Sequence, residues 1–398
     1  MRAKDYPFML LQIINGYTTD DLPSAADWES LIRQAQADGV APLLYWNLSK
    51  TGKLAQIPDF AGNALRESYA ATWMNNQQIL QELGTISKVF HEAGIPIVLL
   101  KGVCFALTIY PDIGLRPMGD LDILVPKTKL AQGVQLAQKL GYVEAVPDAS
   151  PGLNELIGHH ACLRKTGEQG SLLEIHDSLV AEQAFSFAVS MDWFWEQTQP
   201  LAHEIFHHLQ MLSPTAQVLF AAAHAMLQHG QQNSPLRWFY DIDLLIRSYN
   251  EAIDWEMLIQ QARFFEWGSA LKSALERSVE LFETPIPQAV REQLQLLSDR
   301  HENLVAQKQN KPATHTLLEL QKMNTLSGYA RLQFFMGLLA PTPAYMRWRY
   351  GLKNNRSLPA WYVYRWAGIL KDAILTIVVV VKNIVMGMRD SNQTQKRD

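Results

Sequence analysis

Two aspartates separated by one residue open an apolar segment in the first third of the chain, Asp120-Leu-Asp122-Ile-Leu-Val125. Side chains two apart on a strand point to the same face, so Asp120 and Asp122 would project together, opposite to Leu121 and Ile123. Neighbouring carboxylates repel each other, and a bound divalent cation is the simplest relief of that repulsion. The spacing therefore predicts a cation site on one face of a strand.

A further acidic strand follows about fifty residues later. Glu174 and His176 share one face of the predicted strand 172–176, which forms a hairpin with the predicted strand 161–165. Glu174 could join the aspartate pair as a third carboxylate, and three oxygen ligands favour Mg²⁺ or Mn²⁺ over zinc. For His176 we expect orientation of Glu174 rather than direct binding of the metal.

Basic residues precede the aspartates. The continuous apolar run Ile95–Leu100 is typical of a buried strand, and it leads directly into Lys101. The ammonium group of Lys101 could bind phosphate or extend into solvent from the strand end. Arg116 lies in a turn before the second strand, where it could contact phosphate or pair with Asp112 or Asp120.

The periodicity of apolar residues divides the chain into four parts. Residues 1–84 have helical spacing, residues 85–185 alternate short strands with helices, and residues 186–300 return to helical spacing. Residues 301–398 form a helical extension with an apolar tail, and the polar stretch 303–316 within it is typical of a flexible connection. The pattern predicts an α+β core between helical segments.

Composition limits the classes of protein to which the chain could belong. Its 398 residues carry 35 Lys and Arg against 39 Asp and Glu, a net charge of −4, so no bulk positive field would attract nucleic acid. Its two cysteines cannot build a disulfide framework. The apolar stretch 8–14 lacks a cleavage site, so we expect a cytoplasmic protein.

The C-terminal tail has two interpretations. Residues 373–381 form an apolar run of nine residues, whereas a membrane-spanning helix needs about 20. The run could be a packed terminal helix or strand. Because Trp and Tyr residues precede it, residues 361–388 could instead contact a membrane surface or a protein partner.

The helical second half contains one polar pair of interest. Arg237 and Asp241 are four residues apart, so they could form a helix ion pair or line a cleft beside the strand-rich core. We expect Trp238 and Phe239 to belong to the hydrophobic core. The histidines of residues 203–229 lack a His-Glu-x-x-His motif, and no metal site is predicted there.

These motifs carry a resemblance. Lys101-Gly102, then Arg116-Pro117-x-x-Asp120-x-Asp122, then Glu174-x-His176 resemble an uncharacterised bacterial nucleotidyltransferase family, within the superfamily of DNA polymerase β. Tyr110 also matches the core motif of that family. Further motifs similar to its helical part follow; they are His224, His229, Leu236-Arg237-Trp238, Asp241 and Pro341–Tyr350.

The resemblance implies an α+β fold, with a small mixed-sheet nucleotidyltransferase core, N-terminal helices and a larger C-terminal helical domain. It also implies metal-dependent transfer of a nucleoside monophosphate from an NTP, such as ATP, to an acceptor hydroxyl. Asp120 and Asp122 would hold Mg²⁺ or Mn²⁺ against the triphosphate, and pyrophosphate would leave. Glu174 would ligate the catalytic metal and help to deprotonate the acceptor.

The resemblance assigns nucleotide contacts to Lys101, Gly102 and Arg116, with His176, Arg237 and Asp241 as supporting or substrate residues; Gly102 would let the backbone approach a phosphate. The sequence has Gly102-Val103 where the superfamily has Gly-Gly or Gly-Ser. This departure favours an alternative, a catalytically inactive nucleotide-binding or protein-interaction module. For an enzyme, the acidic balance favours a small-molecule or sugar acceptor over nucleic acid. The oligomeric state is not predicted.

Overall fold

A computed structural model describes most of the chain in two compact units. The described residues are 8–16, 24–154, 160–167, 170–179, 189–229, 234–297, 323, 326 and 328–375. Unit 1 comprises Met1–Val143, His160–Val180 and Val189–Val305, and unit 2 comprises Glu144–His159, Ala181–Ala188 and Ala306–Asp398. The predicted flexible stretch 303–316 and the tail beyond residue 375 lie outside the described residues.

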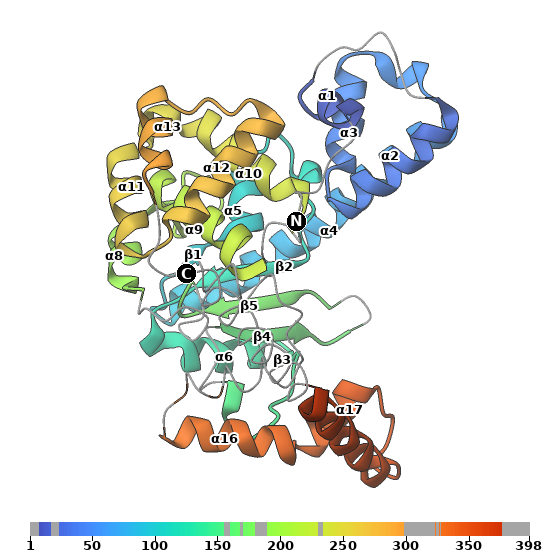
Figure 1. The fold of residues 1–398 in the computed structure, drawn as a ribbon, viewed down its shortest axis with the longest axis vertical. Coiled ribbons are helices and arrows are strands. Elements are labelled where there is room, and N and C mark those ends of the chain that lie inside the picture. The colour runs from blue at the N-terminus through green and yellow to red at the C-terminus, as the bar shows by residue number, and fades with distance from the viewer. Residues whose placement is uncertain are drawn as a thin grey trace, which may run out of the picture. The chain divides into compact units, whose positions relative to one another are not determined.

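Helices form the N-terminal part of unit 1, as predicted (Figure 1). In the longest helix, α4, Ile79, Leu83, Ile86 and Phe90 recur at helical spacing and are buried in the main core. Gly94 lies just past the end of this helix, and its φ of 65° suits glycine. The helices are α1 (Phe8–Ile14), α2 (Ala25–Ala37), α3 (Ala41–Lys50) and α4 (Asp59–Glu92).

A mixed sheet of seven strands forms the centre of unit 1, in the order β3-β4-β5-β2-β1-β7-β6. β2 pairs antiparallel with β1 and parallel with β5, and the predicted hairpin of β4 and β5 is confirmed. The strands are β1 (Val98–Leu99), β2 (Asp120–Leu124), β3 (Tyr142–Glu144), β4 (His160–Lys165), β5 (Leu172–His176), β6 (Thr198–Pro200) and β7 (Gln210–Leu212).

The strands β6 and β7 were not predicted, because residues 186–300 read as wholly helical. Each has three residues, too few to show a period of two. The fold class is nevertheless the predicted α+β arrangement, in which helices flank one mixed sheet.

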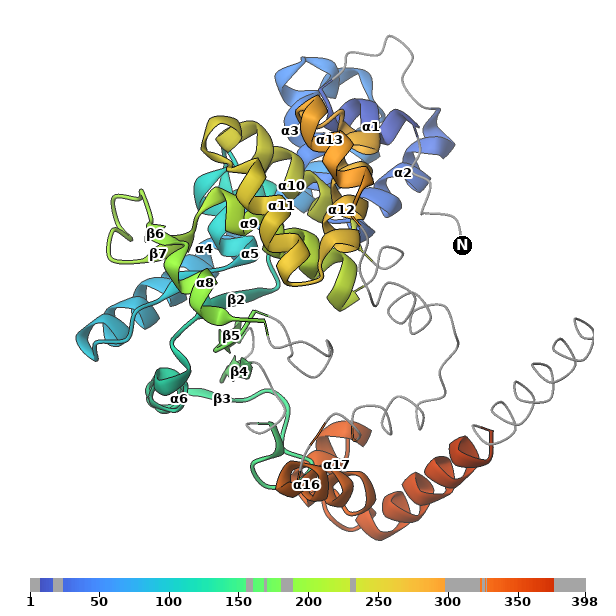
Figure 2. The same cartoon turned by 60° about the vertical axis from the view of Figure 1, so that its left-hand side comes forward.

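The two faces of the sheet differ in chemistry. On β2 and β5 the side chains of Leu121, Ile123, Leu173 and Ile175 are buried in the core that α4 and α6 (Leu130–Lys139) help to form. The alternate residues of these strands carry the polar groups. Figure 2 shows α6 on one side of β2, with α9 and α10 on the other. The apolar face thus anchors both strands, and the polar face lies opposite α9 and α10.

Helices cover that polar face. In α10 the buried residues Phe239, Ile242 and Ile246 form the inward stripe. The six-residue π-helix His224–His229 directly follows α9. Besides α6, the described α-helices of unit 1 that follow β1 in the sequence are α5 (Lys101–Thr108), α8 (Met191–Glu196), α9 (Pro214–Ala223), α10 (Leu236–Tyr249), α11 (Trp255–Phe264), α12 (Gly268–Phe282) and α13 (Gln288–Gln295).

Unit 2 has a small core of its own. Leu153, Leu326 and Phe334 are buried together, and Ala149 packs against them. Its helices are α16 (Gly328–Leu339), α17 (Pro343–Tyr350) and a helix over 358–375. In the described part of the chain, none of the helices has both the length and the apolar character that crossing a bilayer requires.

Candidate active site

Three carboxylates meet on the polar face of the sheet. Asp122 on β2 and Glu174 on β5 are register partners in parallel strands, and Asp120 lies two residues before Asp122 on the same face. All three line one pocket of unit 1. The alternation predicted from the sequence and the parallel pairing of β2 with β5 together place them there.

Asp122 is the most strongly held of the three. It is 3 % exposed, and its Oδ1 lies 2.9 Å from Nζ of Lys101 and 2.8 Å from Nε2 of His176. Burial alone would raise the pKa of Asp122, but Lys101 and His176 outweigh burial and hold that pKa well below its usual range. Asp122 therefore stays ionised.

Asp120 has a different environment. Burial, together with repulsion from Asp122 and Glu174, raises the pKa of Asp120 to about 6, although Lys101 and Arg116 oppose the rise. The positive charges of Lys101 and Arg116 thus neutralise the negative charge of the three carboxylates only in part. An additional positive charge would relieve it, which is the electrostatic property expected of a metal site.

The donor atoms fit a divalent cation. Ligand atoms of Asp122, Glu174 and His176 all lie within 4.8 Å of one another. Two carboxylates and one imidazole suit Mn²⁺, and the oxygen donors suit Mg²⁺. From the sequence we predicted Asp120 as the third ligand, and we expected His176 to orient Glu174. Nε2 of His176 lies 3.4 Å from Oε2 of Glu174. That distance leaves both roles open to His176.

The opposite end of the pocket holds a buried ion pair. Nε and Nη2 of Arg116 donate to the two carboxylate oxygens of Asp241, at 2.8 and 2.7 Å, and Tyr110 donates to Oδ1 at 2.8 Å. Nη1 of Arg116 donates to the carbonyl of Pro117. Arg116 thus pairs with neither Asp112 nor Asp120, the local partners considered from the sequence.

Arg237 begins α10 beside this ion pair. From the sequence, Arg237 could pair with Asp241 or line a cleft with it; Asp241 is engaged by Arg116, and both residues line the pocket. Nε of Arg237 is buried and has no hydrogen-bond partner among the described residues. Burial, followed by the nearby Arg116, lowers the pKa of Arg237. A cation in this setting would gain from an anionic ligand.

Lys101 and Gly102 join β1 to α5. Lys101 has a φ of 45°, in the left-handed region that non-glycine residues rarely adopt, so the chain turns sharply here. Gly102 lies in the first turn of α5 and lines the pocket. A Cβ added at Gly102 would lie 3.3 Å from Cγ of Met118, so a larger residue would crowd the pocket wall.

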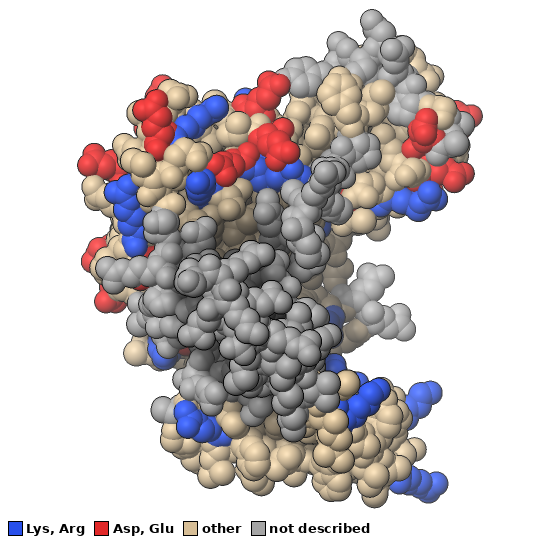
Figure 3. All heavy atoms as spheres, viewed as in Figure 1, with Lys and Arg blue, Asp and Glu red and all other residues tan. Residues whose placement is uncertain are grey.

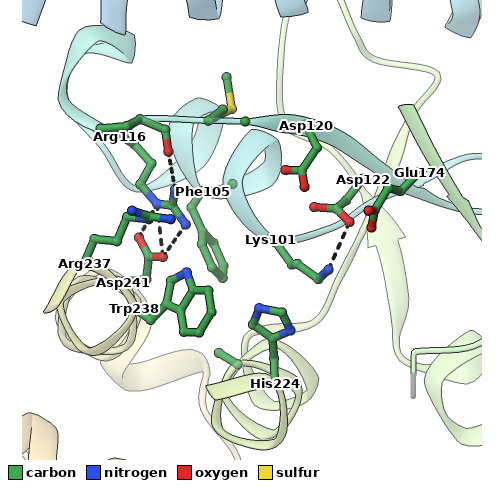
Figure 4. Close-up of a pocket in the computed structure, with 15 residues that line it drawn as sticks. Lys101, Phe105, Arg116, Asp120, Asp122, Glu174, His224, Arg237, Trp238 and Asp241 are labelled. Atoms are coloured by element: carbon green, nitrogen blue, oxygen red, sulfur yellow. Dashed lines mark hydrogen bonds and ion pairs between the residues drawn. The ribbon is translucent and has the colours of Figure 1, made fainter. Parts of the chain in front are cut away.

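The pocket has a volume of about 270 Å³, close to the lower end of the roughly 300–1,000 Å³ typical of small-molecule sites. Figure 4 shows the three carboxylates and Lys101 on one side, and Arg116, Arg237 and Asp241 on the other, with Phe105 and Trp238 between them. The lining residues are Lys101, Gly102, Phe105, Arg116–Asp120, Asp122, Glu174, Ala221, His224, Arg237, Trp238 and Asp241.

The sequence interpretation missed some of these residues. Trp238 was assigned to the core with Phe239, but only Phe239 is buried there; Trp238 lines the pocket. Trp238 lies three residues before Asp241, outside the inward stripe of α10, and that spacing was the available signal. The ring of His224 lies 4.7 Å from that of Trp238, and its place in a π-helix, often a functional feature, was not predictable.

Comparison with family models agrees with the prediction of an uncharacterised nucleotidyltransferase family. The chain is similar to a solved structure of an antigenic nucleotidyltransferase-like protein from Paracoccidioides brasiliensis, with 14% sequence identity and a TM-score of 0.35. The match covers 54% of this chain and 97% of that protein's chain. No curated protein matches the sequence significantly. The family described as "uncharacterised nucleotidyltransferase" matches residues 24–283, which include every residue of the pocket. The chain therefore belongs to this uncharacterised nucleotidyltransferase family.

Proposed function

We propose that this protein transfers a nucleoside monophosphate from an NTP to the hydroxyl of a small molecule or sugar, by the chemistry of the DNA polymerase β superfamily. The register of Asp122 with Glu174, beside Asp120 in one pocket, carries the proposal. Membership of the nucleotidyltransferase family supports the same reaction.

In the proposed reaction the acceptor oxygen forms a bond to the α-phosphorus as the bond from that phosphorus to the α,β-bridging oxygen breaks. Pyrophosphate leaves with the electrons of that bond, and the hydroxyl proton passes to the carboxylate of Glu174. Mg²⁺ or Mn²⁺, held by Asp122 and Glu174 with Asp120 or His176, would supply charge neutralisation at the phosphates.

Three residues are suited to hold the triphosphate. Lys101 can share its ammonium group between Asp122 and a phosphate, and Gly102 leaves the backbone open in the first turn of α5. Arg237 has the buried Nε that lacks a partner among the described residues, so we assign it an anionic group of the substrate.

Arg116 has a different proposed role. Its guanidinium is 5 % exposed and held by Asp241, so we assign it the task of fixing the loop that leads into Asp120. Phe105 and Trp238, between the two charged ends, give the nucleotide base an apolar wall. We place the reaction in the cytoplasm, where NTPs are abundant.

The inactive module stays a second candidate, because one observation favours it. Nζ of Lys101 lies 2.9 Å from Asp122 and gives the cluster a cation of its own. Under that interpretation the pocket would bind a nucleotide without turnover. The two candidates therefore differ in whether pyrophosphate is released.

A turnover assay tests the proposal. The full chain is incubated with each of the four NTPs, Mg²⁺ or Mn²⁺, and a panel of sugars and other hydroxyl acceptors, and pyrophosphate release is measured. Binding of Mn²⁺ is followed in parallel by electron paramagnetic resonance. We expect Asp122→Asn and Glu174→Gln each to lower turnover about 1,000-fold, because the interaction of a metal with phosphate contributes several kcal/mol.

Glu144→Gln is the matched control, because Glu144 is an exposed strand carboxylate outside the pocket, and its turnover should equal that of the wild type. Turnover that survives Asp122→Asn would overturn the proposed reaction. Nucleotide binding without pyrophosphate release under every condition would establish the second candidate instead.

A further inference from the structure

Unit 2 carries a concentration of positive charge. Residues 328–375 hold seven of the chain's 35 Lys and Arg residues but only one of its 39 Asp and Glu residues, Asp372. Among the basic residues, Arg349, Lys353, Arg356 and Lys371 are exposed. The region that α16 and α17 occupy in Figure 1 shows basic and uncharged residues in Figure 3, without visible Asp or Glu.

The helix α16 is apolar on two opposite sides. Ala330, Phe334 and Gly337 face the small core of unit 2, where Phe334 and Gly337 are buried. A helix that is apolar all round needs cover on both sides. Its other side is exposed and consists of Tyr329, Leu332, Phe335, Met336 and Leu339.

The helix over 358–375 presents a second apolar stripe. Val363, Trp366, Leu370 and Ile374 are spaced by three or four residues, which places them on one side of a helix. They are 61, 49, 63 and 54 % exposed. This stripe also has no cover among the described residues.

Hydrogen bonds join the two helices at the end of α16. Nε1 of Trp366 donates to the carbonyl of Leu339 at 2.6 Å, and Nε of Arg365 donates to that of Leu338 at 3.2 Å. Tyr362 donates to the carbonyl of Pro341. The exposed stripes therefore belong to one connected surface, here called the C-terminal surface: the exposed apolar residues of both helices, with Arg349, Lys353, Arg356 and Lys371.

We propose that the C-terminal surface binds an anionic lipid bilayer, with its helices lying in the interface rather than crossing it. Exposed basic residues are attracted to anionic headgroups, and Trp and Tyr favour the depth at which headgroups meet acyl chains. Leu370 and Ile374 would enter the acyl region. This inference is independent of the reaction proposed for unit 1.

The composition of the surface favours lipid over the other occupants. Nucleic acid would use the basic and aromatic residues, but it offers nothing to Leu332, Leu370 and Ile374. A second copy of the chain would bring the same positive charge against itself, which opposes association. An anionic bilayer offers a charged layer beside an apolar one and so matches both properties of the surface.

Vesicle co-sedimentation of the full chain tests the proposal. Phosphatidylcholine vesicles, with and without 30 % phosphatidylserine (a fraction of about this order gives an anionic surface), are compared at low and high salt. We expect binding to the anionic vesicles only, weakened by salt. Leu370→Glu with Ile374→Glu should lower the partition coefficient at least about 10-fold, because charge is costly in the acyl region.

The basic residues are tested separately. The triple variant Arg349→Gln, Lys353→Gln and Arg356→Gln should have a partition coefficient about 100-fold lower, because each basic residue contributes about 1 kcal/mol of attraction to an anionic surface. Two controls carry matched changes at exposed sites of unit 1. One is Phe264→Glu with Leu296→Glu, at residues 75 and 76 % exposed, and the other is Lys88→Gln with Lys127→Gln and Lys139→Gln.

Equal binding by the controls and the wild type supports the proposal, and circular dichroism verifies that each variant is folded. Absence of binding to anionic vesicles overturns it, as does equal loss of binding in the unit 1 controls. Light scattering could instead show a dimer that does not bind vesicles and that dissociates in the variant Leu370→Glu with Ile374→Glu. That result would overturn the proposal in favour of self-association. An RNA oligonucleotide is also added at a total charge equal to that of the vesicles. If it displaces the protein from the vesicles, the proposal is overturned in favour of nucleic acid.

Discussion

The two units use similar residues in opposite settings. In unit 1, Arg116 is 5 % exposed and paired with Asp241, and Asp122 is 3 % exposed and held by two partners. In unit 2, Arg349 on α17 and Lys353 in the turn after it are exposed, and the neighbouring helices also expose apolar side chains. A buried charged group requires a partner in a defined geometry, whereas exposed charged groups attract a ligand through their combined electrostatic field. This difference fits the two proposals, a small ligand in the pocket of unit 1 and an extended anionic surface against unit 2.

The largest effect of this difference between the units is expected at the buried ion pair of Arg116 and Asp241 in unit 1. Arg116→Met leaves Asp241 as an unpaired buried carboxylate, and we expect the free energy of unfolding of unit 1 to fall by about 3–5 kcal/mol. Urea unfolding combined with hydrogen exchange in α10 measures this loss within unit 1.

The double variant Arg116→Met with Asp241→Leu is the matched control, because it removes both charges. It should regain most of the lost stability, since replacing a buried pair by apolar residues is often neutral. A loss below about 1 kcal/mol for Arg116→Met alone, the range of a surface pair, would contradict the role given to buried charge here.

The same ion pair marks the limit of what the sequence could predict. Asp120 and Asp122 were predictable because the strand period is local, and Glu174 because its own strand has the same period. The pairing of Arg116 with Asp241 joins residues 125 apart in the sequence. Local spacing offered Asp241 only Arg237 as an ion-pair partner, because a helix rule considers only neighbours on the same helix. Both residues line the pocket, which was the other role considered for them.

Short elements and neighbouring side chains also escaped prediction. β6 and β7 have three residues each, and their place in the sheet comes from pairing with distant strands. Trp238 and Phe239 are adjacent in the sequence, yet one lines the pocket and the other is buried in the core. Apolar character alone cannot separate two such residues; the rotation of α10 against its neighbours decides.

A second prediction concerns the small core of unit 2. Among the residues that the structure describes, Phe334 forms a small buried cluster with Leu153 and Leu326, so Phe334→Ala should destabilise unit 2 by about 3 kcal/mol, the lower end for a buried Phe. Hydrogen exchange should increase in α16 and stay unchanged in α10. Increased exchange in both helices would contradict the separate stability of the two units.

The smallest expected effects come from helix capping, at one matched site in each unit. Ser213 caps α9 by accepting from the backbone N–H of Ala216 at 3.3 Å, and Thr342 caps α17 by accepting from that of Tyr345 at 3.2 Å. Each change to Ala should cost about 1 kcal/mol in thermal or urea unfolding. The two losses should be similar, because each hydroxyl also donates one hydrogen bond: that of Ser213 to Oε1 of Gln197 at 2.8 Å, and that of Thr342 to the carbonyl of Asp148 at 2.6 Å. A larger loss for Ser213→Ala would mean that hydrogen bonds contribute less to unit 2, and that its helices depend on the contacts of their apolar sides.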